Sequence, residues 1–265
     1  MADSSMDPAE LLARFDLIRG RGAAEDGAPV EADGPVTRVD YPHGGFIAAP
    51  ADTGLRGADL DALIGRQRDH FAALGKQVEW KTYGYDQPDD LTARLEAAGF
   101  EPEERETVVV GSVAALSDLA GSVPGVTIRE TTDLSDFAAI GALNSEVWGH
   151  DLSWLVGDLS ERIQLGPDRF RVFVAEADGH MVSAAWLVMR PGIEFASLWG
   201  GTTLEKYRGR GIYRALVARR ADVARAAGYS YLQVDASDMS RPILERLGFV
   251  AVTTTTPLVY PLGPS

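Results

Sequence analysis

Two arginines and two glycines alternate in the stretch Arg208-Gly209-Arg210-Gly211-Ile212-Tyr213. An apolar run at 195–199, typical of a strand, precedes it, and the segment from Tyr213 to Ala227 predicts a helix that ends at Gly228. The start of a helix presents about four unpaired backbone N–H groups and the positive end of the macrodipole. Glycine adds no Cβ to keep a ligand away. The stretch therefore predicts a cradle for an anion such as phosphate or pyrophosphate, with Arg208 and Arg210 adding positive charge.

Two better-defined phosphate-binding loops do not fit this stretch. A P-loop requires a glycine, four residues and then Gly-Lys-Ser or Gly-Lys-Thr, and the dinucleotide fingerprint requires a third glycine where Arg214 stands. An ordinary surface turn with solvated arginines is the structural alternative, because Gly and Arg are common in loops. The order of strands and helices around the stretch is therefore needed to distinguish an anion cradle from an ordinary surface turn.

Length and composition limit which functions are open. The 265 residues exceed the roughly 100 to 200 of a typical domain, so we expect two domains, and 45% of the residues are hydrophobic. The absence of cysteine excludes disulfides, thiol nucleophiles and thiolate zinc sites. The four histidines are scattered without the spacing of metal ligands, so we expect no metal.

The net charge of -14 indicates which partners suit the chain. Nucleic acids bind to clustered Lys and Arg, so we expect no nucleic-acid partner, and an acidic surface favours cationic molecules. No apolar run approaches the roughly 20 residues that span a bilayer. Residues 1–7 lack the apolar core of a secretory signal. We therefore expect a cytoplasmic protein that does not enter a membrane.

Hydrophobic periodicity predicts the elements of the first half. They are a helix, two short strands, a long helix, a strand, a second helix and a final strand, at 7–19, 36–41, 46–49, 58–74, 78–83, 88–98 and 107–110. Residues 20–34 are interpreted as a loop. Residues 111–125, rich in Gly, Ser and Ala, predict a domain boundary, and the alternative is a short helix and a loop inside one large domain.

The second half predicts a denser pattern that leads to the arginine–glycine stretch and continues after it. Before the stretch come a strand, two helices and three strands, at 126–129, 133–148, 152–165, 170–175, 181–189 and 193–204. Asp178-Gly179 is a strong hairpin signal between two of these strands. After the stretch and its helix come a strand at 231–235, a short helix from Ser240 that ends at Leu247-Gly248-Phe249, and a strand at 250–260 interrupted by Pro257.

This order resembles the GNAT acetyltransferase superfamily over residues 126–265. Its signature, an arginine or glutamine, two residues, a glycine, one residue and then glycine or alanine, matches Arg208 and Gly211, while Tyr213 departs from it. Leu247-Gly248-Phe249 also stands at its expected place. The resemblance implies an α/β fold with a mixed sheet, the GNAT acyl-CoA acyltransferase fold.

Residues 1–115 are interpreted as a degenerate copy of the same fold, which would give two tandem domains. The copy is suggested by the order strand, helix, Gly99-Phe100 and strand. Its nearest match to the signature, Gly20-Arg21-Gly22, lies in the early loop. The alternative is an unrelated domain.

The resemblance implies acetyl-CoA, or another acyl-CoA, as the co-substrate and a small-molecule or peptide amine as the acceptor. The backbone N–H groups of 209–214 would hold the pyrophosphate, and the strand end at 201–203 would pair with the pantetheine arm. A backbone N–H near Thr202 or Thr203 would polarise the thioester carbonyl. Gly200-Gly201 could also be a β-bulge with no ligand. The predicted cofactor-binding residues are Thr202, Thr203, Arg208, Gly209, Arg210, Gly211, Ile212, Tyr213, Arg214 and Ser237.

The catalytic candidates are Ser237 and His150. The resemblance places Ser237, with Asp238 beside it, where relatives have an asparagine, and a turn or capping role explains Ser237 equally well. His150 lies between the two helices that would wall the acceptor site, and histidine has an ordinary pKa of ~6.5. The tyrosine acid of the family is replaced by Leu244, but a thiol with a pKa of ~8.5 leaves tolerably without an acid.

Other residues near the implied site carry weaker expectations. Ser197 stands where some relatives have a carboxylate, and Glu194 is interpreted as a solvated charge at the strand end. Glu146 and Asp151 accompany His150 between the two helices. Trp148 and Trp154 are interpreted as core residues, with a place in the wall of the substrate site as the alternative. The arginines at 214, 219, 220 and 225 are interpreted as a solvated helix face.

Three functions follow from these expectations. The first is an acyl-CoA-dependent N-acetyltransferase with its active site in the second half. The second is an acyl-CoA-binding regulatory protein without turnover, suggested by Leu244. The third is a tandem transferase that uses aminoacyl-tRNA, against which the acidic charge argues.

Overall fold

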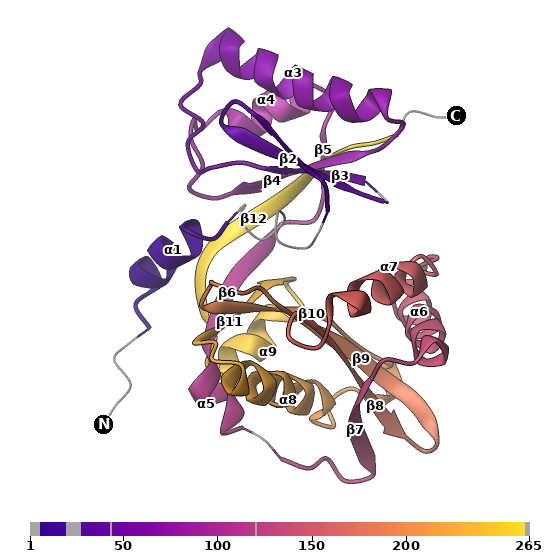
Figure 1. Ribbon diagram of the computed structural model, residues 1–265. Helices are drawn as coiled ribbons and strands as arrows, with labels where there is room; N and C mark the ends of the chain where they lie inside the picture. Colours follow the sequence, from indigo (N-terminus) through magenta and orange to yellow (C-terminus); the bar gives the residue numbers. More distant parts are fainter. Residues whose placement is uncertain (1–5, 20–27, 43, 120, 263–265) are drawn as a thin grey trace. The chain divides into compact units, whose positions relative to one another are not determined.

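The computed structural model describes residues 6–19, 28–42, 44–119 and 121–262. The chain forms two compact units, and each unit is assembled from separate segments of the sequence. Unit 1 comprises Met1–Val109, Asp235–Ile243 and Val250–Ser265, and unit 2 comprises Val110–Val234 and Leu244–Phe249. Each unit is built on strands of a mixed sheet with helices packed against them (Figure 1).

The strands of unit 1 lie in the order β1, β2, β3, β4 and β12, with β5 also paired to β12. Their bounds are β1 Val30–Asp33, β2 Val36–Tyr41, β3 Gly44–Ala48, β4 Val78–Tyr83, β5 Glu101–Pro102 and β12 Val250–Tyr260. Only the pair β3–β4 is parallel among these described pairs. Helix α3 (Gly57–Ala73) connects these two strands, α4 (Leu91–Ala97) follows β4, and α1 (Pro8–Asp16) packs against β12.

The core of unit 1 lies between α3 and the sheet. Alternation along β4 buries Val78 and Trp80, and α3 turns Leu60 and Phe71 toward them. A Cβ at Gly45 would lie 2.3 Å from the Phe71 ring, so only glycine lets β3 approach α3 this closely. The close approach of β3 to Phe71 of α3 therefore depends on that one glycine.

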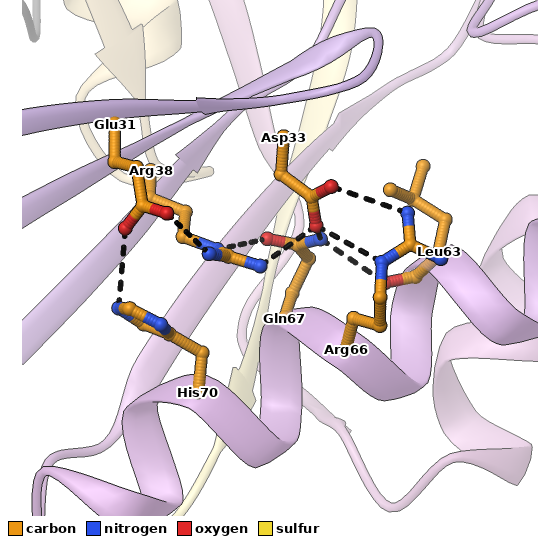
Figure 2. Close-up of polar contacts among 7 residues, drawn as sticks. All are labelled: Glu31, Asp33, Arg38, Leu63, Arg66, Gln67 and His70. Carbon is orange, nitrogen blue, oxygen red and sulfur yellow. Dashed lines mark hydrogen bonds and ion pairs between the residues drawn. The ribbon is translucent and has the colours of Figure 1, made fainter.

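A polar network also joins β1, β2 and α3 (Figure 2). Arg38 donates from Nε to Gln67 Oε1 at 2.8 Å and from Nη2 to Asp33 Oδ2 at 2.7 Å. Gln67 is fully buried and donates to the same carboxylate oxygen at 2.7 Å, and Arg66 adds a further bond at 3.1 Å. Glu31 accepts from Arg38 Nη1 at 3.1 Å. The Asp33 carboxylate is thus the acceptor on which the network converges.

Asp33 predicts a pH dependence of stability in unit 1. The hydrogen bonds from Arg66 and Gln67 hold the pKa of Asp33 below its ordinary value. A carboxyl group with a lowered folded-state pKa stabilises the fold above the unfolded pKa of ~3.9, and this contribution is lost as pH falls through the folded-state pKa. We expect Asp33→Asn to lower the free energy of unfolding at neutral pH by roughly 1 to 2 kcal/mol, with the difference from wild type shrinking below pH ~4.

Urea denaturation over a series of pH values measures this difference. Asp69→Asn is the matched control, because the Asp69 side chain lies on α3 and is 67% exposed. We expect the control to change the free energy of unfolding by less than about 0.5 kcal/mol. A loss for Asp33→Asn that stays constant down to acidic pH would contradict the role of the ionised carboxylate.

Unit 2 contains strands in the order β11, β10, β9, β8 and β7. Their bounds are β7 Val126–Thr131, β8 Phe170–Ala177, β9 His180–Met189, β10 Phe195–Thr203 and β11 Tyr231–Ala236. The pair β10–β11 is parallel, and β10–β9, β9–β8 and β8–β7 are antiparallel. Strand β6 (Glu106–Ser112) begins in unit 1 and ends in unit 2.

Helices cover both faces of this sheet. Helices α6 (Leu134–Trp148) and α7 (Leu155–Arg162) bury Phe137, Ile140, Leu155 and Leu159 against β8 and β9. Helix α8 (Ile212–Ala226) packs on the other face, and α5 (Val113–Ser117) packs on α8 (Figure 1). The short 3-10 helices Ile163–Leu165 and Glu205–Tyr207 follow α7 and β10, and α9 (Arg241–Arg246) follows β11.

The predicted α/β fold with a mixed sheet is confirmed, with two differences of detail. Residues 30–33 of the predicted loop form β1, which pairs with β2 across Asp33-Gly34, a hairpin signal that was present in the sequence. Strand β12 continues through Pro257, whose carbonyl still accepts from the Glu103 N–H at 2.9 Å. Gly20-Arg21-Gly22 lies outside the described residues, and the predicted boundary at 111–125 stays a prediction.

Candidate functional site

The arginine–glycine stretch forms the turn between β10 and α8. Gly209 and Gly211 have φ angles of 74° and 86°, a region that favours glycine, and Gly211 is the N-cap of α8. Within the described part of the chain, no side chain caps the first turn of α8. A Cβ added at Gly209 or Gly211 would meet no atom of the described residues within 4 Å. The turn therefore combines a helix N-terminus without a side-chain cap and open space beside both glycines, as an anion cradle requires.

The two arginines of the turn are exposed. Arg208 donates from Nε to the Thr203 carbonyl at 3.1 Å, which ties the turn to the end of β10. The guanidinium carbon of Arg210 lies 5.2 Å from the centre of the Tyr207 ring, and the Tyr207 hydroxyl donates to Asp178 at 3.0 Å. Both arginines thus supply positive charge at the turn while remaining accessible to a ligand.

Tyr213, the departure from the family signature, directs its ring toward β10. A Cβ added at Gly201 would lie 2.7 Å from Tyr213 Cε2, so the ring packs directly on the backbone of Gly201. Burial raises the pKa of the Tyr213 hydroxyl. The contact with Gly201 accounts for the tyrosine, because the ring rests on the neighbouring strand and the Cβ positions of Gly209 and Gly211 remain open.

Strand β10 bulges where it approaches the turn. Its register against β9 shifts between Gly200 and Thr202, and Gly200 and Gly201 have φ angles of 70° and 84°. A Cβ at Gly200 would lie 2.6 Å from the ring of Trp186 on β9. Trp186 belongs to the α6 and α7 core, while Tyr213 lies on α8, so each glycine of the bulge is covered by an aromatic ring. Both positions require glycine for conformation and for space.

The two threonines after the bulge use their side chains inside unit 2. Thr202 donates to Asn144 Oδ1 at 2.6 Å and accepts from Trp148 Nε1 at 3.3 Å, so it anchors the end of α6 to β10. Thr203 Oγ1 lies 2.8 Å from Ser183 Oγ on β9. Any contact of these threonines with a cofactor would therefore have to use their backbone groups.

The two catalytic candidates occupy different environments. Ser237 Oγ accepts from the Ser240 N–H at 3.4 Å, and its carbonyl accepts from the Arg241 N–H at 2.9 Å, so Ser237 organises the start of α9. His150 is exposed after α6, with Nδ1 3.2 Å from the Trp148 carbonyl. The geometry gives each side chain a local structural role, and their catalytic roles stay predictions.

Three further residues bear on catalysis. Ser197 on β10 donates to Gln233 Oε1 on β11 at 3.1 Å, so its hydroxyl links the two parallel strands. Leu244, at the position of the family's acid, is fully buried. The leucine side chain therefore offers neither a proton donor nor a proton acceptor. Asp151 accepts from the backbone N–H and the hydroxyl of Ser153, and these hydrogen bonds lower its pKa.

Two expectations about side chains near the turn are wrong. Trp148 and Trp154 are 49% and 52% exposed and are not core residues, because α6 ends and α7 begins where they stand. Arg220 is only 1% exposed and is not part of a solvated face. It follows Leu216 by four residues, so helical periodicity places it on the buried side of α8, and that spacing was visible in the sequence.

Unit 1 has a comparable connection from β3 to α3, and it carries its own anion. Asp52 accepts from the Gly54 N–H at 2.8 Å and from both terminal nitrogens of Arg56, at 2.8 Å and 2.9 Å. These bonds, from Arg56 first, lower the pKa of Asp52 to about 2. Asp52 therefore binds Arg56 in the connection before α3, and sequence reasoning had not identified this ion pair.

A second group of charged residues lies on β4, β6 and β11. Lys81 donates to Asp235 at 2.6 Å and lies 4.0 Å from Glu106. Burial, the largest single cause, lowers the pKa of Lys81, but Asp235, Tyr83 and Glu79 together outweigh it, so the pKa is raised. Burial also raises the pKa of Glu79, and it raises that of Glu106 to about 7. Sequence reasoning missed this group because its members are far apart in the chain.

No helix in the described ranges is both long and apolar enough to cross a membrane. Among the same residues, no three His, Cys, Asp or Glu side chains are grouped so that they could hold a metal ion.

Comparisons with known proteins point to one family. Residues 129–249 match the model of the acetyltransferase (GNAT) family, and no curated protein matches the sequence. The chain is similar to the solved structure of a GCN5-related N-acetyltransferase from Kribbella flavida, with a TM-score of 0.72, 18% identity and 98% of each chain covered. For a tandem GNAT protein from the clavulanic acid biosynthesis pathway the TM-score is 0.62 at 14% identity, covering 97% of this chain and 96% of that one. For a GCN5-related N-acetyltransferase from Sphaerobacter thermophilus the TM-score is 0.59 at 17% identity, covering 87% of this chain and 78% of that one. At these identities the likeness shows the fold.

Proposed function

Because residues 129–249 form a domain of the acetyltransferase (GNAT) family, we propose that this chain transfers an acetyl group from acetyl-CoA to the amine of an acceptor. The observation that carries the proposal is the start of α8, which has no side-chain cap and has open space beside Gly209 and Gly211. The N–H groups of residues 209–214 would hold the pyrophosphate, and Arg208 and Arg210 would neutralise its charge.

The transfer requires few groups from the protein. The neutral amine nitrogen attacks the thioester carbon, the carbonyl oxygen takes up negative charge, and the C–S bond breaks to release CoA as a thiolate. A proton passes from the amine to a base, for which we propose His150, whose exposed ring can exchange it with water. A thiol with a pKa of ~8.5 leaves as a thiolate, so the buried Leu244 does not prevent the reaction.

The β10 bulge is the proposed place of the thioester. Backbone groups at Thr202 and Thr203 would pair with the pantetheine arm, because their side chains are already bonded to Asn144, Trp148 and Ser183. One backbone N–H aimed at the thioester oxygen is typically worth ~3 to 4 kcal/mol of transition-state stabilisation. Ser237 keeps its predicted role as a contact of the cofactor arm.

Titration calorimetry with acetyl-CoA and a thiol-release assay with a panel of amines test the proposal. We expect a dissociation constant in the micromolar range and acetyl transfer to small-molecule or peptide amines. Wild-type protein that does not bind acetyl-CoA, or that releases no thiol with any amine, would refute it. His150→Ala should lower kcat at neutral pH by roughly tenfold or more, as expected for loss of a general base.

A second candidate function is an acyl-CoA-binding protein without turnover. It is favoured by Leu244, which removes the acid, and by the hydrogen bonds that engage Ser237 at the start of α9. This protein would bind acetyl-CoA in the calorimeter and release no thiol with any amine. Transfer to one acceptor would eliminate this candidate.

We also propose that the first half, residues 1–115, is a degenerate copy of the domain at 126–265. The parallel pair β3–β4 joined through α3 has the same order as β10–β11 joined through α8. In the first half the connection before the helix holds Asp52, whose carboxylate already takes the N–H of Gly54 and the charge of Arg56. The match to the family signature, Arg208 and Gly211, lies in the second half, so we assign acetyl-CoA to the second half only.

A further inference from the structure

The buried Arg220 of α8 bonds to backbone carbonyls on three elements. Its Nε donates to the Leu216 carbonyl at 3.1 Å, and Nη1 donates to the carbonyls of Trp186 at 3.2 Å and Trp199 at 3.1 Å. Arg220 is 1% exposed. All three acceptors are neutral carbonyl oxygens, one on its own helix and one on each of the strands β9 and β10.

Arg220 has no carboxylate partner among the described residues. The ionisable side chain that acts on it is Tyr213, and burial lowers the pKa of Arg220 to about 10. It therefore stays charged at neutral pH. A buried charge without a counter-charge is costly, and a Leu or Met of similar volume would avoid that cost but would leave the three carbonyls without their donor. The reason for an arginine at this position therefore lies in these hydrogen bonds.

The location of the two strand carbonyls indicates what Arg220 does. Trp199 and Trp186 are direct cross-strand partners, and the bulge at Gly200 begins with the next residue of β10. One guanidinium nitrogen therefore joins β9 to β10 at the residue pair next to Gly200–Ala185, after which the register shifts. Glycines with positive φ follow on β10, so the backbone there has little intrinsic preference and needs an external support.

We propose that Arg220 is a positioning residue for acyl transfer, holding the β10 bulge in the geometry that receives the thioester. This inference rests on the proposed function. The planar guanidinium fixes the carbonyls of Trp186 and Trp199, and it places an unbalanced positive charge on the α8 side of the strand where the thioester oxygen becomes negative. Both effects act in the transition state, so they raise kcat more than they tighten acetyl-CoA binding.

Steady-state kinetics of Arg220→Met and Arg220→Lys test the inference, with Arg219→Met as the matched control from the exposed face of the same helix. We expect Arg220→Met to lower kcat by about 30- to 100-fold while KM and Kd for acetyl-CoA stay within about threefold. Arg220→Lys keeps the charge but cannot bridge both carbonyls in the same way, so we expect about a tenfold loss in kcat. The control should keep wild-type kinetics.

The outcomes separate the inference from the proposed function. Wild-type protein that releases no thiol with any amine refutes the proposed function, whatever the variants do. An active wild type together with folded Arg220 variants that keep kcat within threefold overturns the inference alone, as does a loss that appears entirely as weaker acetyl-CoA binding. If Arg220→Met does not fold, as judged by circular dichroism, the decision rests on kcat of Arg220→Lys.

Discussion

Replacing Gly211 with aspartate is expected to abolish detectable acetyl-CoA binding, raising Kd at least ~100-fold. Gly211 has a φ of 86° and caps α8, so any other residue is strained there, and an aspartate would place a negative charge where the pyrophosphate is proposed to lie. Two like charges about 4 Å apart near a protein surface repel by roughly 4 kcal/mol, which corresponds to more than two orders of magnitude in Kd. Titration calorimetry measures the change.

Gly166→Asp is the matched control for this experiment. Gly166 has a φ of 89° and, like Gly211, has no atom within 4 Å of the place that an added Cβ would take, but it follows α7 and is not part of the arginine–glycine turn. Both variants add one negative charge at a glycine with positive φ, and Gly166→Asp bears at least as much backbone strain, because its ψ is 164° whereas that of Gly211 is 4°. Binding by Gly211→Asp within fivefold of wild type would contradict the assignment of the turn, and equal losses in both variants would attribute the effect to strain.

The turn and its flanking elements were predictable because their signals are local. Glycines at 209 and 211, the apolar strand before them and the helix stop at Gly228 follow each other within a short segment, and the observed bounds of β10 and α8 differ from the predicted ones by only a few residues. The cofactor role of these residues stays a prediction, since sequence and geometry describe a suitable cradle and not its occupant.

The parts that sequence did not reveal depend on contacts between distant residues. Arg220 lay on the apolar stripe of α8, but its charge suggested solvent, and only the carbonyls of Trp186 and Trp199 explain its burial. The pairing of β12 with β4 joins residues more than 150 positions apart, and no local pattern specifies that choice of partner. Asp52 was not singled out in the sequence, and its bonds to Gly54 and Arg56 are visible only in the structure.

Replacing Gly201 with alanine is expected to lower the free energy of unfolding by roughly 2 to 4 kcal/mol. The new Cβ would lie 2.7 Å from Tyr213 Cε2, an overlap that costs ~1 to 3 kcal/mol, and the φ of 84° adds about 1 kcal/mol of backbone strain. Gly192→Ala is the control for strain alone, because Gly192 has a φ of 79° and no atom within 4 Å of the added Cβ. Urea denaturation of both variants separates overlap from strain.

Tyr213→Ala should remove the ring that an alanine at position 201 would overlap, and it should leave the anion cradle at the start of α8 intact. In the double variant with Gly201→Ala, the two substitutions should show a favourable coupling of about 1 to 2 kcal/mol, because the added Cβ then enters the space left by the ring. Tyr213→Ala alone should keep Kd for acetyl-CoA within about fivefold, since backbone N–H groups make the proposed contacts and alanine matches the family signature at this position. A loss of binding beyond about 50-fold would mean that the tyrosine ring itself contributes to the cofactor site, and the start of α8 would then need the support of β10 to bind an anion.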